Sequence, residues 1–143
     1  MEFDTFKSIV DVVKIERPKL FQLEHDNIPA IEEFFEFEKL YHIQLPQKYM
    51  QFLLAYGGGY FGYTNIYSLA NNSPFYLLNH NKPDLKKHLN ISDNGCGDYY
   101  AFHIENGICS ENVIFYDHEN GEMHDTEFCD IFQYLVEIGL NIH

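Results

Sequence analysis

The sequence lacks the features that mark several protein classes. It has no tryptophan, only three cysteines in 143 residues, and no apolar run near the ~20 residues that a membrane-spanning helix needs. The cysteines at positions 96, 109 and 129 are odd in number and widely spaced, which argues against a disulfide framework and against a four-cysteine zinc site. The first residues lack a basic stretch followed by an apolar one, so we expect no signal peptide and a cytoplasmic location.

Basic residues are scarce and are missing from the C-terminal part. The chain has 22 acidic residues against 9 Lys and Arg, a formal net charge of −13. Residues 1–87 contain all nine basic residues and 11 acids, whereas residues 88–143 contain 11 acids and neither Lys nor Arg. Such a segment repels nucleic acid and anionic lipid and attracts a basic protein, although general solubility alone also explains high charge. We therefore expect no nucleic-acid partner and no membrane partner.

Apolar residues are abundant enough for a folded core. Hydrophobic residues make up 45% of the chain, with 13 Phe and 11 Tyr, and the length fits one domain over residues 1–143. Apolar residues at helical spacing indicate helices that each bury one face. In the second predicted helix, the buried face is expected to contain Ile31, Phe34, Phe35 and Tyr41. Helices are predicted over Phe3–Val13, from Asp26–Pro29 to Tyr41, over Gln47–Tyr56 between Pro46 and the glycine run 57–59, and over Glu127–Leu140.

Short aromatic and β-branched runs after residue 60 predict strands. Three Asn-Gly pairs, at 94–95, 106–107 and 120–121, are typical hairpin turns and favour an antiparallel meander. Pro74–Leu78 is open to a short helical turn, and Pro83–His88 to a loop. We predict an α+β fold with N-terminal helices, an antiparallel sheet of about five or six strands and a C-terminal helix packed on it. The predicted strands are Tyr60–Tyr63, Asn65–Leu69, His88–Ile91, Tyr99–Ile104 and Val113–Asp117.

An ordered set of short motifs resembles the SUKH superfamily, the group that includes the yeast cell-wall assembly regulator. The segment Leu45–Gly62, with its Leu-Pro pair, its aromatic helix and its three glycines, is similar to the family hallmark, and Glu38 matches the glutamate that precedes it. Later segments follow in family order over about residues 28–138, and Cys96 departs from the small residue usual there. The later segments are Ile91–Tyr100, Val113–Glu119 and Phe128–Leu135.

The resemblance implies an α+β domain without catalytic residues or cofactors. Many bacterial members are similar to immunity proteins that neutralise toxins, often nucleases, and eukaryotic members serve as regulatory adaptors. We predict a non-enzymatic immunity protein, a monomer or weak homodimer, that binds a basic toxin domain; an intracellular adaptor is the alternative. Acids on or beside predicted turns are the candidate toxin-binding residues: Asp93, Asp98, Glu105, Glu111, Asp117, Glu119, Glu122 and Asp125.

Two sharper interpretations of single residues were weighed against simpler ones. His118 and His124 lie among several acids, but they lack the spacing of a zinc site, so we predict a polar hairpin and no metal. Cys96 lies in a glycine-rich turn without a recognisable base motif, so we predict a turn residue and no catalytic thiol.

Overall fold

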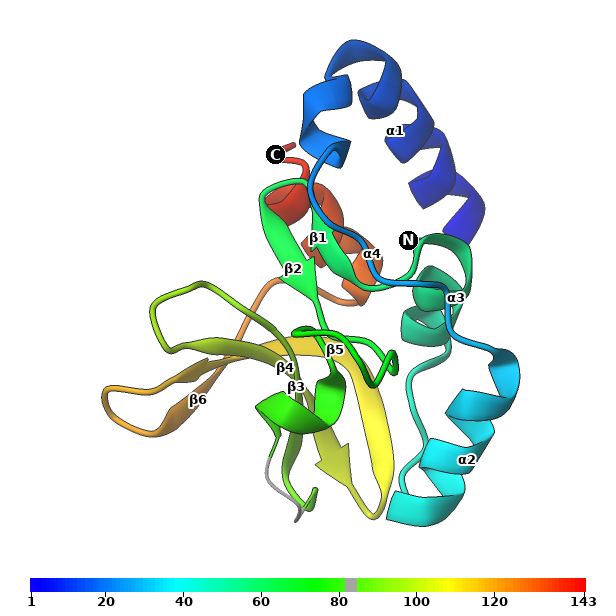
Figure 1. The fold of residues 1–143 in the computed structure, drawn as a ribbon. Coiled ribbons are helices and arrows are strands. Elements are labelled where there is room, and N and C mark those ends of the chain that lie inside the picture. Colours follow the sequence, from blue (N-terminus) through cyan, green and yellow to red (C-terminus); the bar gives the residue numbers. More distant parts are fainter. Residues whose placement is uncertain (82–84) are drawn as a thin grey trace.

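The computed structural model describes residues 1–81 and 85–143 (Figure 1). Helices α1, α3 and α4 gather with a small hairpin at one end of the molecule, an antiparallel sheet forms the other end, and α2 lies beside the sheet (Figure 1). The fold is α+β, as the sequence predicts. The elements are α1 (Phe3–Glu16), α2 (Ile31–Tyr41), α3 (Gln47–Tyr56), β1 (Gly59–Phe61), β2 (Thr64–Ile66), β3 (His88–Asp93), β4 (Tyr99–Glu105), β5 (Ile108–Asp117), β6 (Glu122–Asp125) and α4 (Ile131–Tyr134), which a π-helical turn (Leu135–Gly139) continues.

The main sheet has four antiparallel strands in the order β3-β4-β5-β6. The first two predicted strands form a separate hairpin, β1–β2, so the main sheet is smaller than the five or six strands expected. This hairpin packs on the C-terminal helix, where the Tyr63 amide donates to the Gly139 carbonyl at 2.8 Å. The chain returns to the sheet at Tyr67, whose amide donates to the Ile91 carbonyl at 2.8 Å.

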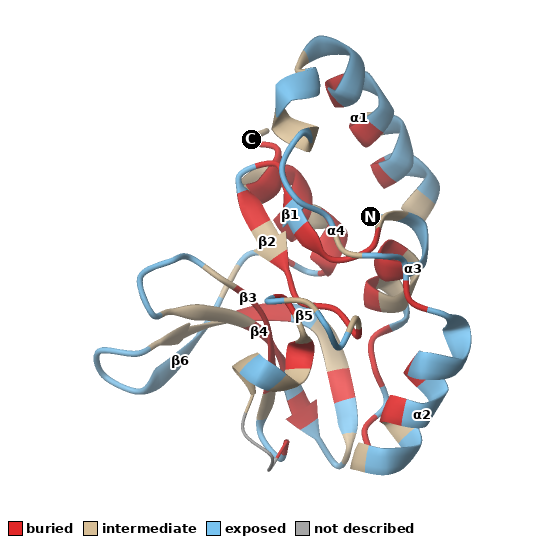
Figure 2. Ribbon diagram, in the orientation of Figure 1, coloured by how far each residue is buried: buried red, intermediate tan, exposed pale blue. Residues whose placement is uncertain are grey.

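All three Asn-Gly pairs lie in hairpin turns, as predicted. Asn106 and Gly107 have φ angles of 52° and 76° and form a two-residue turn between the paired residues Glu105 and Ile108. The other two pairs belong to longer turns, 94–98 between β3 and β4 and 118–121 between β5 and β6. These two turns lie at the same end of the sheet and project from it as exposed loops (Figures 1 and 2).

An aromatic core joins the helical end to the hairpin. The Phe6 ring of α1 is fully buried, stacks on Phe132 of α4 at a centroid distance of 4.7 Å, and meets Phe52 of α3 at 6.1 Å. Phe61 of β1 packs on the same ring at 5.9 Å and is buried. The core continues under the sheet, where Tyr49 meets Phe102 edge-on at 5.5 Å.

The buried face of α2 differs from the predicted one. Phe34 is buried and Tyr41 half-buried as expected, but Ile31 and Phe35 are 48% and 57% exposed. Phe37 is buried instead. Both sides of this helix carry aromatic residues, so helical spacing alone selected the wrong face for Ile31 and Phe35.

The remaining segments differ from prediction mainly in their bounds. The closing helix begins at Ile131, four residues later than predicted, because Asp130 caps it. A short 3-10 turn lies at Leu77–His80 rather than at Pro74–Leu78. The predicted loop Pro83–His88 lies partly outside the described residues, and its last residue begins β3. Among the helices in the described ranges, none has both the length and the apolar character to cross a bilayer.

Candidate functional site

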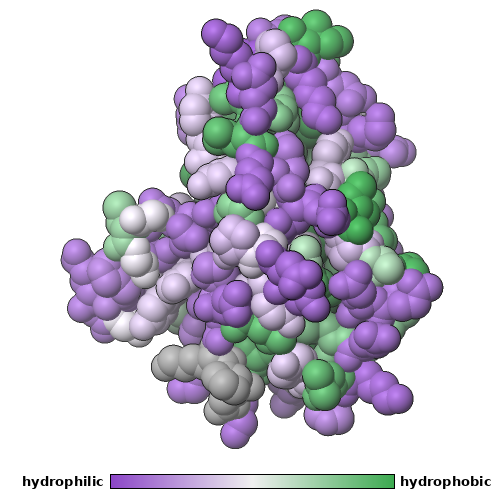
Figure 3. All heavy atoms as spheres, in the orientation of Figure 1, coloured by the Kyte–Doolittle hydropathy of each residue, from purple (hydrophilic) through white to green (hydrophobic). Residues whose placement is uncertain are grey.

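Five of the predicted acids lie together at the end of the sheet where the two longer turns meet. The strand register places Asp98 next to Asp117 across the β4–β5 pair, and Asp117 is paired with Glu122 across β5–β6. Neighbouring strands are about 4.8 Å apart, so these carboxylates form a row. We call the set the acidic edge: Asp93, Asp98, Asp117, Glu119 and Glu122. Figure 3 shows the part of the molecule around β6 and the two longer turns, at the left of the view, as mainly hydrophilic.

The β3–β4 turn is fixed by its own side chains. Asp93 accepts a hydrogen bond from the Gly95 amide, and Asn94 accepts one from the Cys96 amide, both at 2.9 Å. The Asn94 amide group also donates to the Asp98 carboxylate at 2.9 Å. Asx turns of this kind hold a loop in one conformation without a core, so the sequence of the turn positions Asp98.

The β5–β6 turn uses the same chemistry. Asp117 accepts a hydrogen bond from the Glu119 amide and Asn120 accepts one from the Glu122 amide, both at 2.9 Å. The Gly121 amide closes the turn on the Asp117 carbonyl at 2.8 Å. The side chains of Glu119 and Glu122 are exposed, and Glu122 lies 3.8 Å from the His124 ring.

His118 joins the two turns. Its ring Nδ1 lies 2.6 Å from Asp98 Oδ1, its backbone amide donates to the same oxygen at 3.1 Å, and the ring packs against Gly97. The hydrogen bond from His118 is the largest of the causes that lower the pKa of Asp98 to about 2. The same bond is the main cause that raises the pKa of His118. Below the pKa of His118, the pair is therefore a charged cross-link within the acidic edge.

The acidic edge also brings three metal-type ligands together. Ligand atoms of Asp98, Asp117 and His118 all lie within 4.8 Å of one another. Asp98 and His118 already bond to each other, and a closed zinc site needs four ligands. His124 pairs instead with Glu122 at 3.8 Å. Absence of a metal stays a prediction.

Three predicted acids lie away from the acidic edge. Glu105 is exposed at the opposite end of the sheet, beside the two-residue turn. Asp125 is exposed at the far end of β6, opposite Ile114. Glu111 lies within β5, which begins five residues earlier than predicted, and its Oε1 accepts a hydrogen bond from the Lys48 amide at 3.2 Å. Glu111 thereby supports the start of α3.

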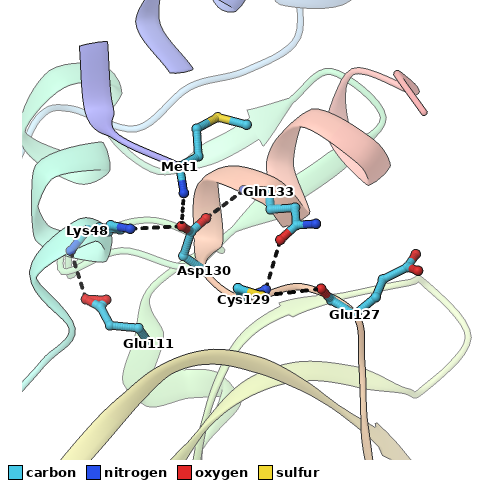
Figure 4. A network of polar contacts seen from close by, with 7 residues as sticks. All are labelled: Met1, Lys48, Glu111, Glu127, Cys129, Asp130 and Gln133. Atoms are coloured by element: carbon cyan, nitrogen blue, oxygen red, sulfur yellow. Dashed lines mark hydrogen bonds and ion pairs between the residues drawn. The ribbon is translucent and has the colours of Figure 1, made fainter. Parts of the chain in front are cut away.

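Sequence reasoning missed a buried polar network around Asp130, which Figure 4 shows. One carboxylate oxygen of Asp130 lies 2.9 Å from the Lys48 ammonium and 2.6 Å from the Met1 amino group. The other oxygen caps α4 by accepting a hydrogen bond from the Gln133 amide at 2.8 Å. Burial works to raise the pKa of this carboxyl group, but its three partners outweigh burial and hold the pKa below its usual value. No local signal marks this network, since Lys48 and Asp130 are 82 residues apart.

One acid of α2 also has a structural partner. Glu38, the glutamate of the motif resemblance, accepts a hydrogen bond from the Leu45 amide at 2.8 Å and so fixes the turn between α2 and α3.

Burial, with lesser contributions from Glu38 and Glu111, raises the pKa of the Cys109 thiol to about 12, which makes this cysteine an inert core residue. Cys96 lies exposed in the β3–β4 turn.

Comparison with known proteins identifies the family. The family model SUKH_6, described as SMI1-KNR4 cell-wall, matches residues 31–133. No curated protein and no solved structure matches the chain. The matched range includes Glu38, α3 with its glycine run, and the whole four-stranded sheet, which is well over half of the 143 residues. The chain therefore belongs to the SUKH superfamily.

Proposed function

We propose that this chain is an immunity protein, which binds a cognate toxin and neutralises it by occupying a basic, nuclease-type cleft, without catalysing a reaction. Membership of the SUKH superfamily is in line with a role in protein–protein interaction. The observation that carries the proposal is the acidic edge: five carboxylates from two hairpins at one end of the sheet, in a segment without Lys or Arg.

The proposal has a simple electrostatic basis. A nuclease holds the phosphates of its substrate with basic residues, so its cleft has a positive potential. A row of carboxylates offers the same charge as phosphates and speeds the encounter by electrostatic steering. The same field repels nucleic acid and anionic membranes, so the partner we propose is a protein.

The acidic edge is also held in one conformation before binding. Hydrogen bonds within the turns fix Asp93, Asp98 and Asp117, and the contact between Asp98 and His118 joins one turn to the other. A surface that is ordered in the free protein loses less entropy when it binds. This order supports tight association with one partner.

An adaptor is the second candidate function, and α2 is the observation that favours it. Ile31 and Phe35 lie one helical turn apart on its exposed side, and Leu40 is 70% exposed. Exposed apolar residues of this kind are suited to a partner that is not strongly basic. Substitution of Phe35 by Ser separates the two functions, because it affects an adaptor contact and leaves the acidic edge unchanged.

The test uses the product of the gene beside the one for this chain, taken as the candidate toxin domain. Tagged protein is mixed with that domain, and both complex formation and residual nuclease activity are measured at low and high salt. We expect a stoichiometric complex that weakens with salt and inhibits the nuclease. The double variant Glu119→Lys/Glu122→Lys is expected to lower the affinity about 10- to 100-fold at low salt, because each change removes an attractive charge and adds a repulsive one.

A matched control has the same change in net charge on another surface. Glu32→Lys/Glu36→Lys alters two exposed acids of α2, and we expect a much smaller loss of affinity. If both double variants weaken the complex equally, only the overall charge matters and the acidic edge is not the binding surface. If wild-type protein binds no toxin domain at low salt, the proposal of an immunity protein fails.

A further inference from the structure

A pocket of about 370 Å³ lies beside the acidic edge and is lined by residues of the β1–β2 hairpin and of the β3–β4 turn. Aromatic side chains from separate segments line it: Tyr60 and Tyr63 of the hairpin region and Tyr100 of β4. Asp93 also lines it, and this residue belongs to the acidic edge. The pocket and the acidic edge therefore share Asp93.

The side chains of Tyr60 and Tyr63 are exposed enough to contact a ligand. Tyr63 is 66% exposed and Tyr60 is 38% exposed, and neither hydroxyl group makes a hydrogen bond to another residue in the described ranges. Tyr63 follows Gly62, and its backbone is anchored by the bond to the Gly139 carbonyl. The ring is consequently presented by a fixed hairpin rather than by a mobile loop.

Asp93 is the one charged residue that lines the pocket in the part of the chain that the structure describes. Its carboxylate accepts hydrogen bonds from the Tyr67 hydroxyl at 2.5 Å, from the Asn65 side chain at 3.2 Å and from the Gly95 amide at 2.9 Å. A carboxylate has about four acceptor positions, so one remains for a ligand. The three bonds hold the carboxylate in place without supplying a countercharge.

We propose that this pocket receives an arginine side chain of the partner protein. A guanidinium group stacks on aromatic rings and donates to a carboxylate at the same time, and it is more weakly hydrated than an ammonium group. A pocket with three tyrosines, one carboxylate and no basic residue suits that group in its charge and in its aromatic lining. The inference rests on the proposed function, because it names the side chain by which the basic partner is recognised beside the acidic edge.

The first test needs no toxin. Arginine with both ends capped is titrated into ¹⁵N-labelled protein at millimolar concentrations, and amide shifts are followed by NMR. We expect saturable shifts at Tyr63, Asn65 and Gly95, and none with capped citrulline, the neutral analogue of the same shape. Equal binding of capped citrulline or capped phenylalanine would show a neutral occupant and overturn the inference, as would the absence of saturable shifts with arginine.

A pair of variants locates the effect. Tyr63→Ser removes an exposed ring that makes no ring contact with the described residues, so the fold is expected to persist. Loss of its stacking on the cation is expected to weaken capped-arginine binding about 5- to 30-fold. Phe35→Ser removes a similarly exposed ring from α2 and is expected to change nothing. Equal effects of the two variants would contradict the inference.

The toxin complex distinguishes the two proposals. If the toxin domain binds wild type and the Tyr63→Ser variant with the same affinity, the pocket inference fails and the proposed function stands. If the toxin domain does not bind at all, the proposed function fails, and the arginine titration still decides what the pocket binds.

Discussion

His118 and Asp98 form one hydrogen bond between the two turns of the acidic edge, and both groups titrate. The raised pKa of His118 means that its contribution to stability is complete below 6.5, the value for an unperturbed histidine, and is lost as the pH rises through the folded pKa. The lowered pKa of Asp98 means that its contribution is complete above 3.8 and is lost as the pH falls toward about 2. The pair therefore stabilises the edge most between about pH 4 and 6.5.

We predict that Asp98→Asn lowers the pKa of His118 toward the unperturbed value. Asp117 and Glu119 also raise this pKa, so part of the shift remains in the variant. The measurement is an NMR titration of the His118 ring in both proteins. Glu36→Gln, on α2, serves as control and is expected to leave the titration unchanged. An identical His118 pKa in the wild type and in Asp98→Asn would show that the hydrogen bond does not exist in solution.

Among the secondary-structure elements, the β1–β2 hairpin depends on Gly62. This residue has a φ angle of 59°, and a Cβ atom there would lie 2.0 Å from the Gly139 carbonyl oxygen. Gly62→Ala combines left-handed strain with a backbone clash, and we expect it to lower the free energy of unfolding by about 3 kcal/mol or more. Gly95→Ala is the matched control, because Gly95 has a φ of 77° and open space around it. We expect a loss of about 1–2 kcal/mol there, measured by urea unfolding.

Helix α4 depends on Asp130 as both a cap and a buried countercharge. Asp130→Ala leaves the Lys48 ammonium and the Met1 amino group without their carboxylate, and we expect a loss of about 3–5 kcal/mol. Asp125→Ala, at an exposed acid on β6, is expected to stay within about 0.5 kcal/mol of wild type. Because the folded pKa of Asp130 lies below 3.8, its contribution is present above that pH and lost as the pH falls further. A difference between wild type and Asp130→Ala that does not shrink below pH 4 would contradict this role.

The elements that the sequence predicted best are those with local signals. Pro46 and the glycine run gave the bounds of α3, and the Asn-Gly pairs gave the three turns of the sheet. The early start of β5 has no such signal, because residues 110–112 are polar and the contact that Ile108 and Cys109 make with Gln44 joins segments far apart in the chain. In the candidate site, too, contacts between residues far apart in the chain leave no local signal in the sequence. Sequence identified an acidic segment, but the role of Glu111 at the start of α3 depends on a contact across 63 residues.

At the scale of the whole molecule, the location of charge matters as much as its sum. The net charge is −13, yet the acids of residues 88–143 divide into the acidic edge, residues used within the fold, such as Asp130 and Glu111, and scattered exposed positions. A partner approaching from solution senses the field of the whole chain within about 8–10 Å at physiological salt, so the nearest carboxylates dominate. The two turns of the acidic edge project from the sheet as exposed loops (Figures 1 and 2), so under our proposal they are the part of the molecule that a basic partner approaches first.

With the proposed toxin as partner, this arrangement predicts which rate constant of binding depends on salt. Raising the ionic strength from about 0.01 M to 0.15 M shortens the screening length from about 30 Å to 8 Å, so we expect the association rate constant to fall about 10- to 100-fold. The dissociation rate constant is set by short-range contacts and is expected to change little. In Glu119→Lys/Glu122→Lys the salt dependence of association is expected to flatten, whereas Glu32→Lys/Glu36→Lys, with an equal change in net charge, is expected to retain most of it. Stopped-flow mixing over a salt series measures both constants, and equal slopes for the two variants would mean that total charge, and not the acidic edge, steers the encounter.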